Sequence, residues 1–289
     1  MQSLYEAKIR SRTILKEASS KFKSLILDYI APKTFMLKAR IPFRAVIVTG
    51  SMNSGKTSFS KALIARAVKQ LLKNSIDENE ITFIHSYERD ISEIIDNVKN
   101  EIDFSKTKYL YLFNDDAAAT SAFSTLRLKG TNIPEIQFYV MLRHRMEKLG
   151  FNGILIVFHA TQVFNVIDKV FRTTSELYLF KSYPMDPNDI KLIGQLIGKA
   201  GMKALADITY KLRVLSDLDT FLEGVYTAVA KLIKSKRLVK AYEYTIDEIN
   251  NYVKLLNKIN YIIIEPKDVQ IMTRNTPPPY RIQRVHSYG

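Results

Sequence analysis

The 289-residue sequence contains no cysteine, and this absence excludes several kinds of chemistry at once. Without cysteine the chain has no disulfide, no thiolate nucleophile and no zinc site built on thiolates. Histidine is scarce as well, and the four histidines show no spacing typical of metal ligands: His85, His144, His159 and His286. The chemistry of this protein must therefore depend on other side chains and on the backbone.

Long apolar runs are also missing. No stretch approaches the roughly 18 to 20 apolar residues needed to span a membrane, and the N-terminus lacks the apolar segment of a secretory signal peptide. We therefore expect a soluble intracellular protein that is not an integral membrane protein.

Negative charge is in short supply. The chain has 43 Lys and Arg against 29 Asp and Glu, which gives a formal net charge of +14. Such a surplus favours a polyanionic partner, either nucleic acid or an anionic membrane surface. A surface that is simply rich in lysine would give the same number.

Glycine is sparse, with ten residues in all, and two of them stand at the two ends of one short loop. Residues 45–48 form an apolar, β-branched run typical of a strand buried on both faces. The next residues, 50–57, read GSMNSGKT and lead into a long helical pattern. This is G-x-x-x-x-G-K-[ST] between a strand and a helix, the context that a phosphate-binding P-loop requires. Backbone N–H groups of such a loop point at an anion, and the helix N-terminus adds partial positive charge.

The P-loop pattern predicts roles for individual residues. Lys56 is expected to reach the β- and γ-phosphates of ATP, and the Thr57 hydroxyl is expected to hold the Mg²⁺ that bridges them. The residues expected to bind the nucleotide are Gly50, Ser51, Met52, Asn53, Ser54, Gly55, Lys56, Thr57 and Ser58.

Another predicted strand is followed by two acidic residues, which is the form of a Walker B element. The apolar run 109–113 leads to Asn114 and then to Asp115 and Asp116. A carboxylate at the carboxyl end of a strand near the P-loop strand can hold Mg²⁺. A second carboxylate can orient and deprotonate the water that attacks the γ-phosphate. We assign Asp115 to the metal and Asp116 to the water, although the pattern also allows the reverse order, and such a pair alone can simply begin a helix.

A third polar group follows the strand expected over residues 153–158. Gln162 is the candidate for sensing the γ-phosphate or the attacking water, and Thr161 and His159 are alternatives. The competing interpretation is that Gln162 only begins a helix.

The expected fold is an α/β, doubly wound and mainly parallel sheet. Five predicted strands alternate with helices: 45–48, 81–84, 109–113, 153–158 and 176–180. The strand over 153–158 should separate or flank the P-loop and Walker B strands, as in the additional-strand class of P-loop ATPases. The sequence alone leaves that spatial order open.

We divide the chain into three regions. Residues 1–42 form a basic helical extension, residues 43–215 form the ATPase core, and residues 216–289 form a helical region that ends in a Pro-rich basic tail. The amphipathic N-terminal helix could contact DNA, a membrane surface or a neighbouring subunit, or it could pack on the core with a solvated Lys-rich face.

Together with the helix that carries Arg143 and Arg145, these motifs resemble the FtsK–HerA superfamily of P-loop ATPases, over roughly residues 44–215. Within that superfamily they look most like the virus genome-packaging ATPases of the poxvirus-type lineage, which includes archaeal viruses. The resemblance implies a RecA-like core in a homo-oligomeric ring that uses ATP and Mg²⁺ to move double-stranded DNA. It also implies an arginine acting on a neighbouring subunit's nucleotide, for which Arg143, Arg145 and Arg172 are candidates.

The resemblance further implies a docking partner, such as a capsid or membrane protein, and a location in the host cytoplasm or with the virion. The favoured function is a DNA-translocating ATPase, most concretely a viral packaging motor. Lys129 and the run 231–240 are candidates for sequence-tolerant DNA contacts. A plasmid-transfer, conjugative or replication ATPase would have the same core. The alternatives of a different class are a nucleotide kinase and a non-catalytic, ATP-gated scaffold.

Overall fold

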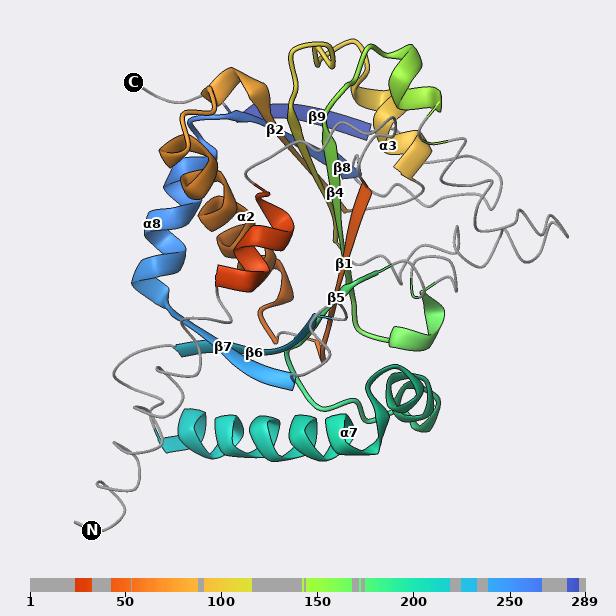
Figure 1. The fold of residues 1–289 in the computed structure, drawn as a ribbon, viewed down its shortest axis with the longest axis vertical. Coiled ribbons are helices and arrows are strands. Elements are labelled where there is room, and N and C mark those ends of the chain that lie inside the picture. Colours follow the sequence, from red (N-terminus) through yellow and green to blue (C-terminus); the bar gives the residue numbers. More distant parts are fainter. Residues whose placement is uncertain are drawn as a thin grey trace, which may run out of the picture.

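The computed structural model describes residues 24–32, 43–52, 54–87, 91–115, 142, 144–167, 172, 175–218, 225–232, 239–266 and 280–285. Within these residues one sheet has the strand order β7-β6-β5-β1-β4-β3-β2-β8-β9 (Figure 1). The strands are β1 (Phe43–Thr49), β2 (Ile81–Ser86), β3 (Tyr109–Asn114), β4 (Ile154–Thr161), β5 (Leu177–Phe180), β6 (Val225–Leu232), β7 (Val239–Thr245), β8 (Asn260–Pro266) and β9 (Tyr280–Val285).

The central strands from β5 to β8 run parallel, and antiparallel strands extend the sheet at both edges. Strands β2, β3 and β4 are buried along their whole length, which explains their continuously apolar sequences. The predicted α/β fold and all five predicted core strands are confirmed. The order left open by the sequence is now defined, because β4 lies between the P-loop strand β1 and the acid-bearing strand β3.

Helices cover both faces of the sheet (Figure 1). One face packs against α2 (Lys56–Lys73), α8 (Ile246–Leu256) and the helical residues 24–30. The other face packs against α3 (Ile91–Val98), part of α7 (Pro187–Leu218) and the helical residues 144–148. Two 3-10 turns complete the described elements, η1 (Glu78–Glu80) and η2 (Phe164–Val166).

Helix α7 consists of two segments, which Figure 1 shows at an angle to each other. They meet at Gly198, whose φ of 73° and ψ of 172° interrupt the helical backbone. Helix α7 thus begins at Pro187 and is interrupted at Gly198. Among the residues that the structure describes, no helix is both long and apolar enough to cross a membrane.

The N-terminal helical segment is part of the core wherever the structure describes it. Ile26 and Ile30 are fully buried. The Tyr111 hydroxyl donates to the Ile30 carbonyl over 2.8 Å, and the Tyr109 hydroxyl donates to the Pro32 carbonyl over 2.7 Å. Burial raises the pKa of Tyr111 well above its usual value, so that this hydroxyl keeps its proton. Of the alternatives left open above, packing on the core is the one observed for residues 24–32.

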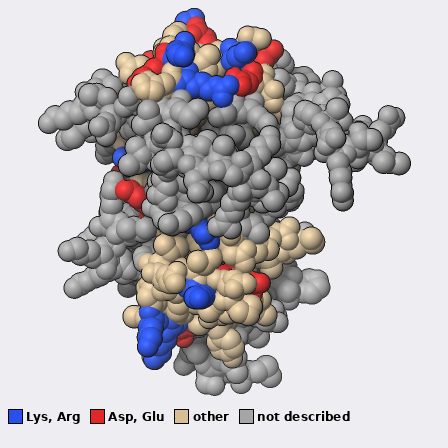
Figure 2. Space-filling model, turned by 90° about the vertical axis from the view of Figure 1, so that its right-hand side faces the viewer, with Lys and Arg blue, Asp and Glu red and all other residues tan. Residues whose placement is uncertain are grey.

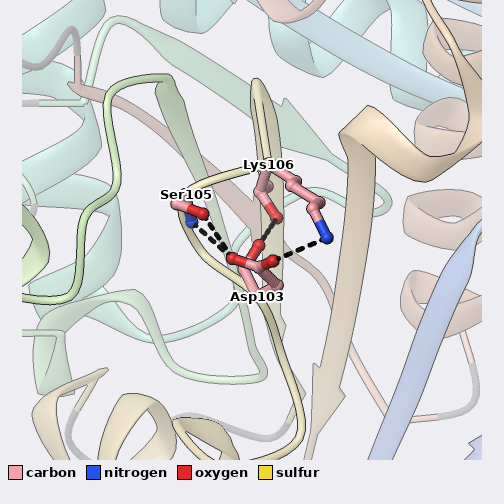
Figure 3. Close-up of polar contacts among 4 residues, drawn as sticks. Asp103, Ser105 and Lys106 are labelled. Carbon is pink, nitrogen blue, oxygen red and sulfur yellow. Dashed lines mark hydrogen bonds and ion pairs between the residues drawn. The ribbon is translucent and has the colours of Figure 1, made fainter.

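A tight turn fixes the start of β3, the strand that leads to the acids (Figure 3). Asp103 Oδ1 accepts hydrogen bonds from the backbone N–H of Ser105 over 3.1 Å and from its hydroxyl over 2.5 Å. Asp103 Oδ2 pairs with Lys106 Nζ at 3.1 Å. The Ser105 hydroxyl, followed by Lys106, lowers the pKa of Asp103.

The sequence predicts two or three helices between Asp217 and Leu256, and this prediction is wrong for part of the stretch. The structure forms strands β6 and β7 there, and only then does α8 begin at Ile246. Val, Tyr and Thr recur in both strands, and these residues favour a pleated sheet over a helix. Strand β8 was not predicted at all, and β9 lies within the Pro-rich tail, for which no strand was predicted. All four strands extend the same sheet as the core, and the three-region division stays a prediction.

Candidate nucleotide-binding site

The loop between β1 and α2 has a backbone that its two glycines make possible. Gly55 has φ 76° and ψ 29°, in the left-handed region that side chains disfavour. A Cβ added to Gly50 would lie 2.7 Å from the Cβ of Lys181 and 2.8 Å from Ser54 Oγ. Both obligatory glycines of the pattern are therefore required by the geometry of the loop.

Lys56 turns back over this loop. Its Nζ donates to the carbonyl of Gly50 over 3.1 Å and to that of Ser51 over 3.0 Å. The first turn of α2 carries no acidic residue, so no carboxylate of that turn offsets the ammonium group or the helix N-terminus. The helix N-terminus and the Lys56 ammonium group both favour an anion at this loop.

The two strands next to β1 hold the loop from both sides. From β4, the Thr161 carbonyl accepts a hydrogen bond from Gly50 N over 3.3 Å. From the end of β5, the Ser182 hydroxyl accepts one from Ser51 N over 3.0 Å. These two hydrogen bonds tie the loop to both neighbouring strands.

Lys181, at the end of β5, belongs to this brace. Its backbone N–H donates to the Thr49 carbonyl over 2.8 Å, and its ammonium group lies 5.3 Å from the centre of the Phe59 ring. Burial lowers the pKa of Lys181 from 10.5 to about 7, because the charged form loses hydration. Nothing in the sequence pattern singles out this residue, and its position beside Gly50 is what draws attention to it.

The structure brings Thr57 and Asp115 together. The Thr57 hydroxyl donates to Asp115 Oδ2 over 2.6 Å. Asp115 is 5% exposed, and its backbone N–H donates to the Ser86 carbonyl over 2.7 Å. Mg²⁺ prefers a few protein oxygens together with phosphate oxygens and water, and these two side chains offer such a donor set. Asp116 and Asn53 lie outside the described residues.

His85 also faces this carboxylate, a contact that sequence reasoning missed. Its Nε2 lies 3.6 Å from Asp115 Oδ2, and the side chain is fully buried. The available signal was its position at the end of the strand that precedes the Walker B strand. Clusters of three or more His, Cys, Asp or Glu suited to a metal are absent from the described part of the chain.

The three candidate sensors lie at the end of β4, and the structure describes their surroundings. His159 lies inside the strand, and burial lowers its pKa to about 3, so the imidazole is neutral near pH 7. The Thr161 hydroxyl is used in a turn, donating to the Val163 carbonyl over 2.9 Å. Gln162 is the first residue after the strand and is half-buried.

The loop that follows Gln162 is tied to helix α7. The buried Asp189 carboxylate accepts hydrogen bonds from Phe164 N over 2.8 Å and from Asn165 N over 2.7 Å. Asp189 lies in the first turn of α7. These two hydrogen bonds join the loop directly to the start of α7.

Among the candidate arginines, Arg145 forms an ion pair with Asp96 of α3. The two side chains are 40% and 41% exposed, and ion pairs at this exposure contribute little to stability and can be exchanged. Arg172 is half-buried, and its carbonyl accepts a hydrogen bond from the Tyr178 hydroxyl. Arg143 lies outside the described residues.

The positive surplus is not gathered into one area on the face that Figure 2 shows, as far as its described residues go. Lys and Arg side chains adjoin Asp and Glu side chains in its upper part. Residues 1–23 alone contain six Lys and Arg against two Glu, but these residues, Lys129 and 233–238 lie outside the described part. The structure therefore leaves the proposed DNA contacts as predictions.

No family model and no curated protein matches the chain. Among solved structures, it is similar to the genome-packaging NTPase B204 of Sulfolobus turreted icosahedral virus 2 in complex with ATP-γ-S. That match has 14% identity, covers 70% of this chain and 97% of that chain, and has a TM-score of 0.43. The DNA-packaging ATPase B204 of Sulfolobus turreted icosahedral virus gives 13% identity, 70% and 97% coverage and a TM-score of 0.44.

The chain is also similar to a RuvB variant of Thermotoga maritima, with 15% identity, coverage of 83% of this chain and 69% of that chain, and a TM-score of 0.31. These similarities are weak. The assignment to an α/β P-loop NTPase fold is carried by the strand order and the P-loop geometry of the chain itself.

Proposed function

We propose that the protein is an Mg²⁺-dependent ATPase that translocates double-stranded DNA, most concretely a viral genome-packaging motor. One observation carries the ATPase part of the proposal: the hydrogen bond from Thr57 to Asp115 joins the P-loop to the end of β3. A P-loop whose hydroxyl meets a strand-end carboxylate has the parts needed to bind a nucleotide together with a metal ion.

In this proposal the chain binds the phosphates through the backbone N–H groups of the loop and through Lys56, whose ammonium exchanges the Gly50 and Ser51 carbonyls for phosphate oxygens. Thr57 and Asp115 would hold Mg²⁺, which when bound neutralises charge on the β- and γ-phosphates. Asp116 directly follows Asp115 and is assigned to accept a proton from the attacking water.

The end of β4 would report the state of the γ-phosphate. Gln162 stands at the end of the strand between the P-loop strand and the acid-bearing strand, where a polar side chain can contact the γ-phosphate or the attacking water. The hydrogen bonds from the following loop to Asp189 offer a route from this position to α7 and from there to β6 and β7, which α7 contacts.

The DNA-directed part of the proposal is supported by the net charge of +14 and by the family resemblance. Contacts through Lys and Arg to phosphates are tolerant of sequence and weaken steeply with salt. In a homo-oligomeric ring, Arg143, Arg145 or Arg172 would act on the neighbouring subunit's nucleotide. Docking to a capsid or membrane protein, and a place in the host cytoplasm or with the virion, belong to the same proposal.

The decisive test is ATP hydrolysis measured with and without duplex DNA, at low and at high salt. We expect DNA to stimulate hydrolysis at low salt, and we expect Lys56→Ala and Asp116→Ala to abolish it. Lys73→Ala is the matched control, because Lys73 is exposed at the other end of the same helix. Hydrolysis that ignores DNA, with no retention of DNA at low salt, would contradict the motor while leaving the ATPase intact.

A further inference from the structure

His85 occupies a position that the pattern of its strand would give to an apolar residue. All six residues of β2 are buried, and His85 itself is fully buried between β3 and β8. Burial of a polar ring costs free energy unless the ring gains a compensating polar interaction. Its position therefore requires an explanation beyond core packing.

The ring is held by aromatic neighbours. It stacks on Phe113 of β3 with the ring centres 4.9 Å apart and the planes 16° from parallel, and it meets Tyr87 at 4.4 Å. His85 and Phe113 are register partners. Stacking of this kind fixes the plane of the imidazole.

The same register explains why the imidazole faces Asp115. Asp115 directly follows β3 and comes two residues after Phe113, and its carboxylate lies beside the imidazole that stacks on Phe113. Asp115 Oδ2, the oxygen 3.6 Å from His85 Nε2, is also the oxygen that accepts the Thr57 hydroxyl. At 3.6 Å the contact is longer than a hydrogen bond, but a shift of about half an ångström would make it one.

We infer that His85 is a positioning residue for the metal site: from its Nε2–H tautomer it orients the Asp115 carboxylate toward Thr57 and the nucleotide-bound cation. Asp115 is then held from three sides, by Ser86 through its backbone, by Thr57 through a hydroxyl and by His85 through a ring. The inference rests on the proposed function. Groups that orient metal-binding side chains in this way typically change metal affinity by about 10- to 100-fold when they are removed.

The test measures how strongly Mg²⁺ tightens nucleotide binding, independently of turnover. The dissociation constant of a fluorescent ADP is measured for the full-length chain in EDTA and in Mg²⁺, and the ratio of the two constants is compared among variants. His85→Phe keeps the ring and its stack but loses the donor, and we expect its ratio to fall about 10-fold or more. His85→Gln carries an amide N–H near the Nε2 position and should stay within about threefold of the wild type.

Phe83→Leu is the control for disturbed stacking. Phe83 lies two residues upstream and stacks on His85 at 6.4 Å, but it presents no polar atom to Asp115. We expect this variant to lose thermal stability and to keep the wild-type ratio. Should His85→Phe fail to fold, His85→Asn replaces it, because its shorter amide cannot reach Asp115 whereas that of His85→Gln can.

The outcomes separate the inference from the proposed function. A wild-type ratio in His85→Phe, alongside a lowered ratio in Thr57→Val, would overturn the inference and leave the nucleotide site intact. Wild-type nucleotide binding in Lys56→Ala, with a wild-type ratio in Thr57→Val, would instead overturn the proposed function itself.

Discussion

Lys181 makes the stability of the nucleotide-free protein depend on pH in an unusual direction. Its pKa falls from 10.5 to about 7 in the folded chain because the ammonium is buried beside the P-loop. Between these two pH values the unfolded chain holds the proton and the folded chain does not. The free energy of unfolding attributable to this group therefore rises as pH increases from about 7 toward 10.5, and below pH 7 the full cost of burying the charge remains.

The magnitude follows from the size of the shift. Each pKa unit corresponds to about 1.4 kcal/mol, so the shift sets an upper bound of about 5 kcal/mol. The ammonium group is buried, but Lys181 as a residue keeps some exposure to solvent. Solvent close to the group screens its charge, so we expect about 1–3 kcal/mol. Lys181→Met keeps the length and the apolar stem, so the variant should be more stable than the wild type by this amount near pH 6.

The assay is urea unfolding followed by circular dichroism, without nucleotide, from about pH 6 to about pH 9.5. The stability difference between Lys181→Met and the wild type should shrink steadily as the pH rises. Lys181→Arg is the matched control, because a guanidinium does not lose its proton in this range, and it should stay destabilised throughout. A difference between Lys181→Met and the wild type that is constant across the range would refute the reasoning.

Three further predictions follow from individual contacts. Tyr111→Phe removes the donor to the buried Ile30 carbonyl and should lower the free energy of unfolding by about 1–3 kcal/mol in urea titrations; an unchanged midpoint would show that water replaces the hydroxyl. Asp189→Ala frees the loop after Gln162 and should lower kcat for ATP while leaving the nucleotide dissociation constant nearly unchanged, with Asp189→Asn intermediate; an equal loss in both quantities would contradict a positioning role. Gly50→Ala places a methyl group 2.7 Å from Lys181 Cβ and should weaken binding of a fluorescent ATP by tenfold or more, about 1.4 kcal/mol. Gly194→Ala, with its nearest neighbour at 3.7 Å, is the control for that loss.

The sequence predicts those parts of the fold that depend on interactions between residues close together in the chain. The P-loop and the acid-ended strand are recognisable because loop chemistry and apolar runs act over a few neighbouring residues. Strand β8 escaped prediction because its partner β2 lies far away in the chain, and an apolar run such as that of residues 261–264 says nothing about which strand it will join. Strands β6 and β7 were mistaken for helices because charged residues are interspersed among their β-branched and aromatic ones.

In the candidate site, too, the residues of local motifs were predicted and the residues that depend on strand order were not. The motifs assign Thr57 and Asp115 to the same metal ion, and the structure places the two side chains in hydrogen-bond contact. His85 and Lys181 were missed because their roles depend on strand order, which places β2 beside β3 and β5 beside β1. A histidine at a strand end and a lysine after a strand are unremarkable until that order is known.

The strand order also determines which strands of the sheet can pair while the chain is still being synthesised. Strands β1 to β5 are made first, yet both of their open edges are closed by later segments, β6 at β5 and β8 at β2. Until residues 225–232 and 260–266 leave the ribosome, two strand edges carry backbone groups without their final partners. Unpaired edges recruit other chains, so a polypeptide that stops near residue 215 should aggregate rather than accumulate as a folded ATPase core. We therefore expect the region after residue 215 to protect the core from association with other chains, by pairing both of its edge strands.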